Sequence, residues 1–349
     1  MKATSMKAVI VRERGEADVM SLETHEMPRL APGEVLVEVE AAGVNYADLM
    51  QHRGTYPLTL DLPYTPGMEA VGRVVDTAPD VSRIRVGDRV AALSFAGGAY
   101  AEYLKTVESN VFAVPDAPDD APDDALDAAP VLALLIQGLT AHALLRMSAR
   151  LRPGENVLVH AAAGGVGLLA VRLAKRFGAG RVFGVTGDDA KARAVRDAGA
   201  DAVFNRHDPA WTEAMREMLH ETPHTGEAAI DIVLDPVGAA ITPLNLDVLA
   251  RGGRLVNYGW LSGETPHLTS GQTQAMLFAN QSLTGFALDV FLRDDPGSAR
   301  AAWSELMALL SSGELSPVTT TATGLRNAPD LHRALSEGTN TGKLCLRVR

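Results

Sequence analysis

Residues 160–167 read HAAAGGVG and continue as LLAVRLAKRFGAG over 168–180, and this stretch decides the fold. An apolar run at 156–161, NVLVHA, precedes it and is typical of a short buried strand. After the glycines, apolar residues recur at the spacing of one helix face: Val166, Leu169, Ala170, Leu173 and Phe177. The stretch is therefore a glycine turn between a strand and an amphipathic helix.

The turn matches the three key positions of a dinucleotide-binding fingerprint at Ala162, Gly164 and Gly167, with alanine in the first. Gly164 would let the backbone approach a pyrophosphate, and Gly167 would let the helix pack closely on the strand. The helix start at Gly165 and Val166 would offer unpaired N–H groups and a partial positive charge to phosphates. A purely structural turn is the alternative, but the strand–turn–helix setting favours a cofactor.

From about residue 150 onward, short strands alternate with helical segments. We expect strands at 156–161, 181–187, 201–205, 229–238 and 253–259, and helices at 165–178, 188–199, 209–219 and 244–252. Such alternation predicts βαβ units and a doubly wound parallel sheet, which is an α/β fold.

The chain before this region is rich in strands, which we expect at 7–11, 34–44, 70–78 and 88–93. A β-prone run at 281–288, a helix at 298–310 and a final strand at 343–348 follow the alternating region. The segment 115–130 repeats APDD, which suits either a linker or the acidic first turn of a helix. We therefore predict one domain from 1–130 with 289–349 and a second from 131–288.

Bulk composition narrows the class of protein. The 349 residues suffice for about two domains. The formal net charge of −11 argues against nucleic-acid or anionic-membrane partners. We see no apolar run of the ~18–20 residues that a bilayer span needs, and no export signal. The single cysteine, Cys345, excludes disulfides within the chain and lies in an apolar strand pattern as buried filler. We expect a cytoplasmic protein.

The end of the second strand in the alternating region helps to distinguish a preference for NAD from one for NADP. The acid that holds the ribose hydroxyls stands about 20 residues past the glycines, and here that position is the neutral Thr186. Lys191 and Arg206 could pair with a 2′-phosphate, while Asp188 and Asp189 place negative charge nearby. This pattern favours NADP(H). The alternative is that both cations are solvated surface charges.

Several further segments then match one family in order: 41–57, 65–74, 86–93, 97–103 and 138–145. Together with HAAAGGVG they resemble the medium-chain dehydrogenase/reductase superfamily, and most closely its zinc-independent quinone oxidoreductase branch. The resemblance implies a GroES-like β-barrel catalytic domain, built from the N-terminal part and the C-terminal tail, with a Rossmann domain between them. It also implies a homodimer through an edge strand, for which 281–288 is the candidate.

The resemblance also bears on whether the protein binds a catalytic metal ion. Zinc-dependent members carry cysteine and histidine where this chain has Asn45 and Met68, and neither amide nor thioether suits catalytic zinc. Glu69 alone does not make a site. We expect no metal, and therefore reduction of a quinone or α,β-unsaturated carbonyl, which needs orientation and hydrogen-bond donors but no Lewis acid.

Tyr56 is the candidate proton donor, because related quinone oxidoreductases often have a tyrosine there at the mouth of the active cleft. Its alternative is a turn aromatic packed beside Pro57. By the same resemblance Asn45 would face the nicotinamide through its amide, or else stabilise its loop. Tyr46 is a weaker candidate than Tyr56.

Three further positions match segments near the nicotinamide in the family: Thr140, Gly259 and Phe286. Thr140 could equally be an ordinary intrahelical threonine, and Gly259 and Phe286 would act through their main chain. His160, in the first strand of the alternating region, fits a core histidine better than a catalyst.

These observations predict an NADPH-dependent oxidoreductase that acts on a small-molecule quinone or enone. One alternative is an enoyl-thioester reductase acting on CoA or carrier-protein substrates. It would want a basic entrance, and the sequence shows no cluster of Lys or Arg near the candidate cleft. The other alternative is a non-catalytic NADPH-binding protein, since fold does not determine function.

Overall fold

The computed structural model describes residues 4–115, 126–220 and 229–348, so most of the APDD segment lies outside the described residues. The chain divides into two compact units. We call Met1–Ile136 with Leu292–Arg349 the mixed-sheet unit, and Gln137–Phe291 the parallel-sheet unit. The boundaries expected from the sequence lie six and three residues before these divisions.

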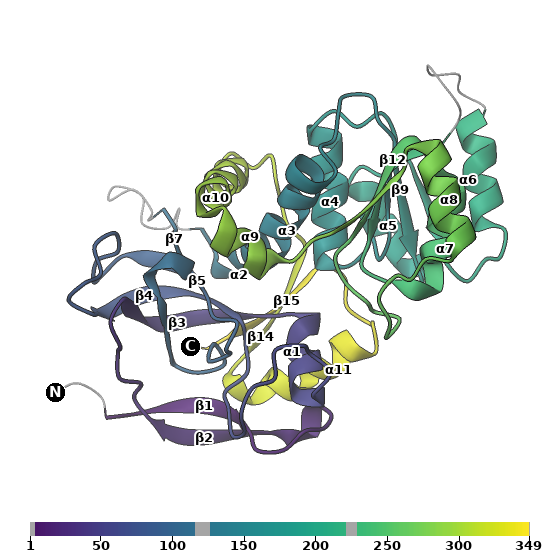
Figure 1. The fold of residues 1–349 in the computed structure, drawn as a ribbon. Coiled ribbons are helices and arrows are strands. Elements are labelled where there is room, and N and C mark those ends of the chain that lie inside the picture. The colour runs from purple at the N-terminus through teal and green to yellow at the C-terminus, as the bar shows by residue number, and fades with distance from the viewer. Residues whose placement is uncertain (1–3, 116–125, 221–228, 349) are drawn as a thin grey trace. The chain divides into compact units, whose positions relative to one another are not determined.

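The parallel-sheet unit is built on a six-stranded sheet in the order β10-β9-β8-β11-β12-β13, with every pair parallel (Figure 1). Its strands are β8 (Val157–Val159), β9 (Val182–Thr186), β10 (Ala202–Asn205), β11 (Ile230–Asp235), β12 (Leu249–Asn257) and β13 (Ser282–Gly285). Its helices are α3 (Leu139–Ala143), α4 (Gly165–Arg176), α5 (Asp189–Asp197), α6 (Trp211–His220), α7 (Thr242–Val248) and α8 (Ser270–Ala279). In chain order the strands run 3-2-1-4-5-6, which confirms the predicted Rossmann arrangement.

One boundary in this unit was wrong. The sequence pattern extends a helix over 244–252, but α7 ends at Val248 and Leu249 already pairs with Ile230 in the sheet. The amide of Gln281 donates to the Leu249 carbonyl at 2.8 Å, which holds this early part of β12 in place. Tertiary pairing thus overrides local helical periodicity here.

Apolar side chains from the strands and from α6 form the core of this unit. Its fully buried members include Leu158, Phe183, Met215, Val233 and Leu255. The predicted strands supply most of them because the central strands β8, β9 and β11 are buried on both faces, as expected in a parallel sheet.

The mixed-sheet unit holds a seven-stranded sheet in the order β14-β15-β3-β4-β5-β7, with β6 also paired to β3, and a separate pair β1-β2. Its strands are β1 (Ser5–Val11), β2 (Met20–Glu26), β3 (Glu34–Val44), β4 (Glu69–Thr77), β5 (Arg89–Leu93), β6 (Tyr103–Val107), β7 (Val111–Ala113), β14 (Thr319–Thr323) and β15 (Lys343–Arg347). Its helices are α1 (Tyr46–Arg53), α2 (Ala128–Ala133), α10 (Pro296–Ser311) and α11 (Ala328–Ser336), and α9 (Leu288–Asp294) crosses the boundary between units.

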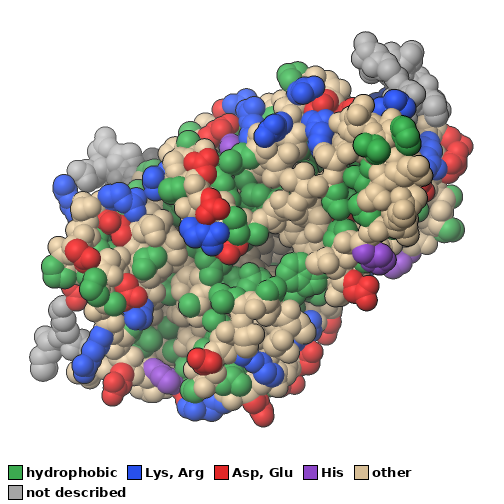
Figure 2. Space-filling view, viewed as in Figure 1, with side chains coloured by type: hydrophobic (Ala, Val, Ile, Leu, Met, Phe, Trp, Pro, Cys, Tyr) green, Lys and Arg blue, Asp and Glu red, His purple; other side chains and the backbone are tan. Residues whose placement is uncertain are grey.

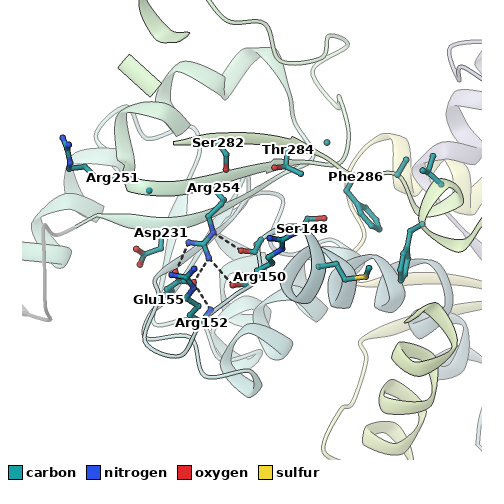
Figure 3. A pocket seen from close by; sticks show the side chains of 17 residues that line it. Ser148, Arg150, Arg152, Glu155, Asp231, Arg251, Arg254, Ser282, Thr284 and Phe286 are labelled. Atoms are coloured by element: carbon teal, nitrogen blue, oxygen red, sulfur yellow. Dashed lines mark hydrogen bonds and ion pairs between the residues drawn. The ribbon is translucent and has the colours of Figure 1, made fainter. Parts of the chain in front are cut away.

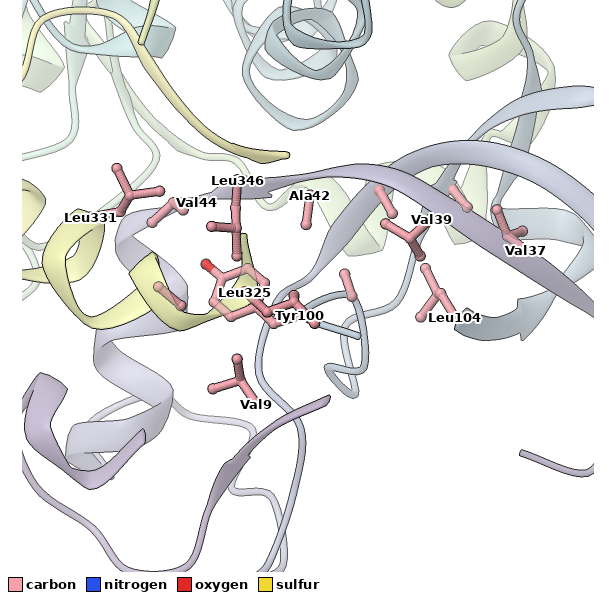
Figure 4. Close-up of a cluster of buried hydrophobic side chains, with 14 of the residues drawn as sticks. Val9, Val37, Val39, Ala42, Val44, Tyr100, Leu104, Leu325, Leu331 and Leu346 are labelled. Atoms are coloured by element: carbon pink, nitrogen blue, oxygen red, sulfur yellow. The ribbon is translucent and has the colours of Figure 1, made fainter. Parts of the chain in front are cut away.

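The C-terminal tail completes this sheet, because β15 pairs antiparallel with β3 while β14 pairs parallel with β15. Figure 4 shows the result: Leu325, Leu331 and Leu346 from the tail pack with Val9, Tyr100 and other side chains from the first 104 residues. The predicted union of the two chain ends in one domain follows from this packing.

One apolar segment corrects the sequence analysis. Residues 128–148 form 21 continuous helical residues with a mean hydropathy of 1.7, long and apolar enough to cross a membrane. Counting uninterrupted apolar runs missed it, because Gln137, Thr140 and His142 break the run. Of its most apolar window, 83% is buried inside the protein, as expected of a core helix.

Candidate active site

The glycine turn between β8 and α4 is tightly closed. Ala161 has a positive φ of 48°, and its carbonyl accepts from the Gly164 N–H at 2.9 Å. A Cβ on Gly167 would lie 2.4 Å from that same carbonyl and 2.7 Å from the Ala162 Cα. The first turn of α4 therefore presses directly on the loop, and only glycine allows this approach.

The start of α4 is open to a ligand. Its N-cap is Gly164, and no side chain caps it among the described residues. The first N–H groups of a helix have no intrahelical partner and attract anions. A Cβ on Gly165 would collide with the Gln137 amide, at 1.8 Å from its Oε1. The Gln137 side chain thus lies against this turn. It is 9% exposed, and its Oε1 has no hydrogen-bond partner within the described residues.

The carboxyl ends of β9 and β10 meet beside this turn. The buried Thr186 hydroxyl donates to the Asp188 carbonyl at 3.1 Å, so its one hydrogen is already engaged. The guanidinium of Arg206 lies on Gly187, where a Cβ would come within 2.3 Å of its Cζ. The backbone N–H of Arg206 donates to the Thr186 carbonyl at 2.7 Å, which holds the residue in place. Glycine at 187 is therefore what lets an arginine from the next strand reach the end of β9.

The neighbouring acids have local roles. The Asp188 carboxylate caps α5 by accepting from the Ala190 N–H at 2.8 Å, and Asp189 accepts from the Asn205 amide at 2.9 Å. Lys191 lies in the first turn of α5 and is half-buried. These hydrogen bonds partly offset the negative charge of Asp188 and Asp189 near the end of β9.

The remaining candidates in this unit lie at strand ends and on α3. Thr140 is 7% exposed and lies on α3. The Gly259 carbonyl accepts from the Asn257 amide at 2.8 Å, and the Phe286 N–H donates to the Asn257 carbonyl at 2.9 Å. Asn257 therefore positions both of these segments, a role that the sequence did not reveal.

Asn45 lies in a buried ionic cluster of the mixed-sheet unit. Its Oδ1 accepts from the Lys343 ammonium at 2.8 Å, and its Nδ2 donates to the Glu69 carboxylate at 2.7 Å. Lys343 also pairs directly with Glu69, and both side chains are fully buried. The second Glu69 oxygen accepts from the Ile136 N–H at 3.1 Å. One N–H of the Asn45 amide remains, which is what an amide with two hydrogens allows.

The cluster includes Asn45 and adjoins Met68, the two positions at which the resemblance puts zinc ligands in zinc-dependent members. Met68 is 2% exposed, and Gly43 makes room for Glu69, since a Cβ at 43 would lie 2.3 Å from its Oε1. A lysine ammonium contacts the one carboxylate that the sequence left for a metal. Within residues 4–115, 126–220 and 229–348, no group of three or more His, Cys, Asp and Glu could hold a metal ion.

Asp48, on α1, was not singled out by the sequence. One of its oxygens accepts from the Asn45 N–H at 2.8 Å, and the other has no partner in the described part of the chain. Burial raises the pKa of Asp48 to about 7, although this N–H and the Lys343 charge act to lower it. The carboxyl can therefore gain or lose a proton near neutral pH.

The two tyrosine candidates lie at opposite ends of α1. Tyr46 is its first residue, and Tyr56 follows its C-cap Gly54, with the Tyr56 N–H donating to the Met50 carbonyl at 3.2 Å. Both rings are half-buried.

A second buried polar chain in this unit involves two histidines. Gly15 offers only a carbonyl, so the His52 Nδ1–H donates to it at 2.7 Å. The His332 Nδ1–H then donates to His52 Nε2 at 3.1 Å, and the Tyr100 hydroxyl donates to His332 Nε2 at 2.9 Å. Burial lowers the pKa of His332 to about 3, and also lowers that of His52. The His332 ring is therefore neutral, and the acceptor role of His52 Nε2 fits a neutral ring there.

Two readings from the sequence are confirmed. His160 is 2% exposed, bonds Asn245 at 2.7 Å and has a pKa lowered to about 4 by burial, as befits a core histidine. Cys345 is fully buried, and burial raises the pKa of its thiol to about 12, so it is no nucleophile.

A Rossmann sheet whose first turn is shaped for a pyrophosphate, joined in one chain to a mixed-sheet unit with a buried polar cluster, defines a dinucleotide-dependent oxidoreductase. The family model described as "Zinc-binding dehydrogenase" matches residues 165–312, and the "Alcohol dehydrogenase GroES-like domain" matches 31–116. The chain belongs to the medium-chain dehydrogenase/reductase superfamily, in its quinone oxidoreductase branch. The predicted GroES-like and Rossmann fold is thereby confirmed.

The similar proteins extend over nearly the whole chain. Human quinone oxidoreductase is 30% identical over 343 residues, covering 98% of this chain and 97% of the relative. The rat synaptic vesicle membrane protein VAT-1 homolog is 30% identical over 359 residues, covering 99% and 84%. The structure of Escherichia coli quinone oxidoreductase complexed with NADPH has a TM-score of 0.82 at 28% identity, covering 98% of this chain and 99% of that one.

Proposed function

We propose that this protein is an NADPH-dependent oxidoreductase that reduces quinones or α,β-unsaturated carbonyls without a metal. The observation that carries the proposal is the turn at 160–167, where Gly167 packs on the Ala161 carbonyl and leaves the start of α4 uncapped. Quinone oxidoreductases among the relatives, one of them complexed with NADPH, support it.

The residues of the turn fit the cofactor. Gly164, Gly165, Val166 and Gly167 would hold the pyrophosphate through main-chain N–H groups at the helix start. Arg206, held over Gly187, would pair with the 2′-phosphate, and Lys191 would add positive charge on the same side. Thr186 supports this position through the backbone. When bound, NADPH supplies a hydride.

Gln137 belongs to the same set. An amide beside Gly165 can donate from its nitrogen to a phosphate and accept at its oxygen from a ribose hydroxyl. Leaving that oxygen buried and unpaired costs about 1–3 kcal/mol, which a bound ligand would offset. Thr140, Gly259 and Phe286 would orient the nicotinamide end.

The mixed-sheet unit would supply the groups for the substrate. The Lys343–Glu69 pair fixes the Asn45 amide so that its remaining N–H can donate to a substrate oxygen on which negative charge develops. Tyr56 would then deliver a proton.

The test is NADPH oxidation with a panel of quinones and enones, with NADH in parallel. We expect turnover with NADPH at higher kcat/KM than with NADH. Tight NADPH binding with no turnover of any panel member would instead favour a non-catalytic binding protein. Arg206→Ala should weaken NADPH binding by at least 10-fold and NADH binding much less, since about 1.5–3 kcal/mol comes from a charged hydrogen bond. Arg193→Ala, on exposed α5 surface, is the matched control.

We also propose a cytoplasmic homodimer. β13 is the edge of the parallel sheet, and α8 beside it exposes Leu277 and Phe278 at 71% and 69%. A second copy pairing at this edge would cover both side chains. On the face in Figure 2 acidic and basic side chains are interspersed, which suits a small-molecule enzyme better than a polyanion-binding surface. Sedimentation should give a dimer that Phe278→Glu weakens.

A further inference from the structure

Arginine side chains hold main-chain carbonyls at several places in this chain. Arg254 is one of them: it donates to the Ala149 carbonyl at 2.9 Å and to both Glu155 oxygens, at 2.8 and 2.6 Å. Figure 3 shows this arginine in a cavity of about 860 Å³ beside β13, the edge strand that we assign to a second copy of the chain. Its charge is paired with Glu155, so its role is to join two parts of the fold.

Arg14, which follows β1, is bonded differently. Its Nη1 donates to the Gln51 carbonyl at 2.7 Å, and its Nη2 donates to the Leu60 carbonyl. Its guanidinium lies 5.6 Å from the centre of the Tyr64 ring. In the described part of the chain it has no ion-pair partner, although it is half-buried. The planar guanidinium fork therefore serves to bridge two segments of backbone.

The two bridged carbonyls stand on either side of Tyr56 in the sequence. Gln51 is in the last turn of α1, five residues before Tyr56, and Leu60 stands four residues after it. The Tyr56 N–H donates to the Met50 carbonyl at 3.2 Å, which ties the residue to the end of the helix. Pro57 follows directly, and a proline has a fixed φ and restricts the residue before it. The path of the chain after Pro57 therefore helps to set the backbone of Tyr56.

Residues 57–63, PLTLDLP, form a loop whose backbone is held at one point, and we call it the leucine loop. Within the described residues, its one hydrogen bond is the bond from Arg14 to the Leu60 carbonyl. The Leu60 side chain packs against the core of the mixed-sheet unit, whereas Leu58 and Leu62 are 50% and 40% exposed. Loss of Arg14 would therefore leave the Leu60 side chain as the anchor of this loop.

We propose that Arg14 is a positioning residue of the reductase: by holding the leucine loop to the end of α1, it keeps the Tyr56 hydroxyl placed to give its proton to the substrate. The inference rests on the proposed function, in which Tyr56 is the donor. Arg14 acts through Tyr56 and takes no part in the proton transfer. The two carbonyls call for an arginine, because a lysine ammonium is a point charge that lacks the planar fork.

The hold on the loop can be measured without turnover. Cys345 is the chain's one cysteine and is fully buried, so Leu58→Cys would give a single reactive thiol for a nitroxide spin label. We expect Arg14→Ala to make this label more mobile on the nanosecond timescale, which narrows the lines of its electron paramagnetic resonance spectrum. Val86→Cys, on an exposed loop of the same unit, is the matched control, and Arg14→Ala should leave its spectrum unchanged.

Kinetics tests whether the hold acts through Tyr56. Arg14→Ala should lower kcat for an enone by about 10-fold or more, while the KM and the affinity for NADPH change by less than about 2-fold. Tyr56→Phe should lower kcat by at least as much, since a positioned proton donor contributes about 10²–10⁴-fold. The double variant should have the kcat of Tyr56→Phe alone, because residues that act as a unit are not additive.

Two further variants separate positioning from stability. Arg14→Lys keeps the charge but not the fork, so it should recover stability more than it recovers kcat. Arg73→Ala removes a comparable bond, in which Arg73 donates to the Gly87 carbonyl at 3.0 Å, and should change kcat by less than about 2-fold. Urea denaturation of each variant shows whether it is folded under the assay conditions, and kcat is compared among folded proteins only.

Three results would overturn the proposal: equal mobility of the Leu58→Cys label with and without Arg14, an unchanged kcat in either folded single variant, or a double variant whose kcat falls by the product of the two single losses. Any of them, with enones still reduced by the wild type, would leave the reductase standing. Absence of turnover with every quinone and enone would refute the proposed function instead, and the spin label would then decide alone whether Arg14 holds the leucine loop.

Discussion

The two buried polar regions of this molecule differ in how completely they are satisfied. In the mixed-sheet unit Lys343, Glu69 and Asn45 bond one another and leave one Asn45 N–H over, with a lysine as the resident cation. In the parallel-sheet unit the start of α4 is uncapped, and the Gln137 oxygen beside it has no partner in the described chain. Closed polar groups hold a shape, whereas open ones leave donors and acceptors for a ligand.

The largest effect on stability should come from removing the cation of the Lys343–Glu69–Asn45 cluster. Lys343→Met leaves Glu69 charged and unpaired in the core, which should lower the free energy of unfolding by about 3–5 kcal/mol. Urea denaturation followed by circular dichroism measures it. Adding Glu69→Gln should recover much of the loss, since no buried charge then remains. Equal stability of the single and double variants would show that the cluster is not closed as described. Lys105→Met, which breaks an exposed pair with Glu34, is the control and should cost no more than about 1 kcal/mol.

The glycine turn at the start of α4 should be sensitive to added side-chain volume. Gly167→Ala places a Cβ 2.4 Å from the Ala161 carbonyl, so α4 must shift away from the turn. We expect NADPH affinity to fall at least 10-fold and stability to fall by about 1–3 kcal/mol, as for overpacking. Gly271→Ala, on α8 with open space around it, should change neither. Unchanged NADPH affinity in Gly167→Ala would remove the turn from the cofactor site.

Acid should lower the stability of the folded protein through the buried chain of His52, His332 and Tyr100. His332 is neutral in the folded protein, with its pKa lowered to about 3, whereas an unfolded histidine binds a proton near pH 6.5. The unfolded state therefore gains a proton first as pH falls, and stability declines by about 1.4 kcal/mol per pH unit for this residue between about pH 6 and 4. His332→Gln should make the stability profile shallower over that range, whereas exposed His267→Gln should leave its slope unchanged.

The smallest effect sharpens the comparison most. Gln137→Met removes an unpaired amide at nearly constant volume, so stability should hold or rise slightly while NADPH binds about 5–20-fold more weakly. Gln137→Glu should weaken it further by repelling phosphate. Fluorescence titration measures both, with exposed Gln274→Met as control. A drop in stability with unchanged affinity would make Gln137 an ordinary core residue.

Local patterns were sufficient for the scaffold but not for the contacts between distant segments. β-Branched runs marked β3 and β4 closely, and the glycine turn located β8 and α4. The short strands β2, β6, β7 and β14 were missed, because their alternation is weak and partner strands define them. In the sequence, Lys343 is only the first residue of a predicted strand. The pairing of β15 with β3 is what brings its ammonium to Asn45.

The site residues show the same limit. Arg206 could be proposed from the sequence because it follows a strand in a known arrangement. Gln137 could not, since the sequence QGLTA gives no sign that its amide lies against Gly165. Asp48 could have been noticed as the acid three residues after Asn45, a spacing typical of helix capping, but its raised pKa depends on burial.

The position of Lys343, 274 residues after its partner Glu69, has a consequence for biosynthesis. Residues 137–291 can assemble as soon as they leave the ribosome, whereas Glu69 must wait for its counter-ion until residue 343 has been translated. A nascent chain halted before residue 343 would hold a complete parallel-sheet unit and an incomplete mixed-sheet unit. Truncations at the C-terminus should therefore impair folding of the N-terminal segment long before they affect nucleotide binding.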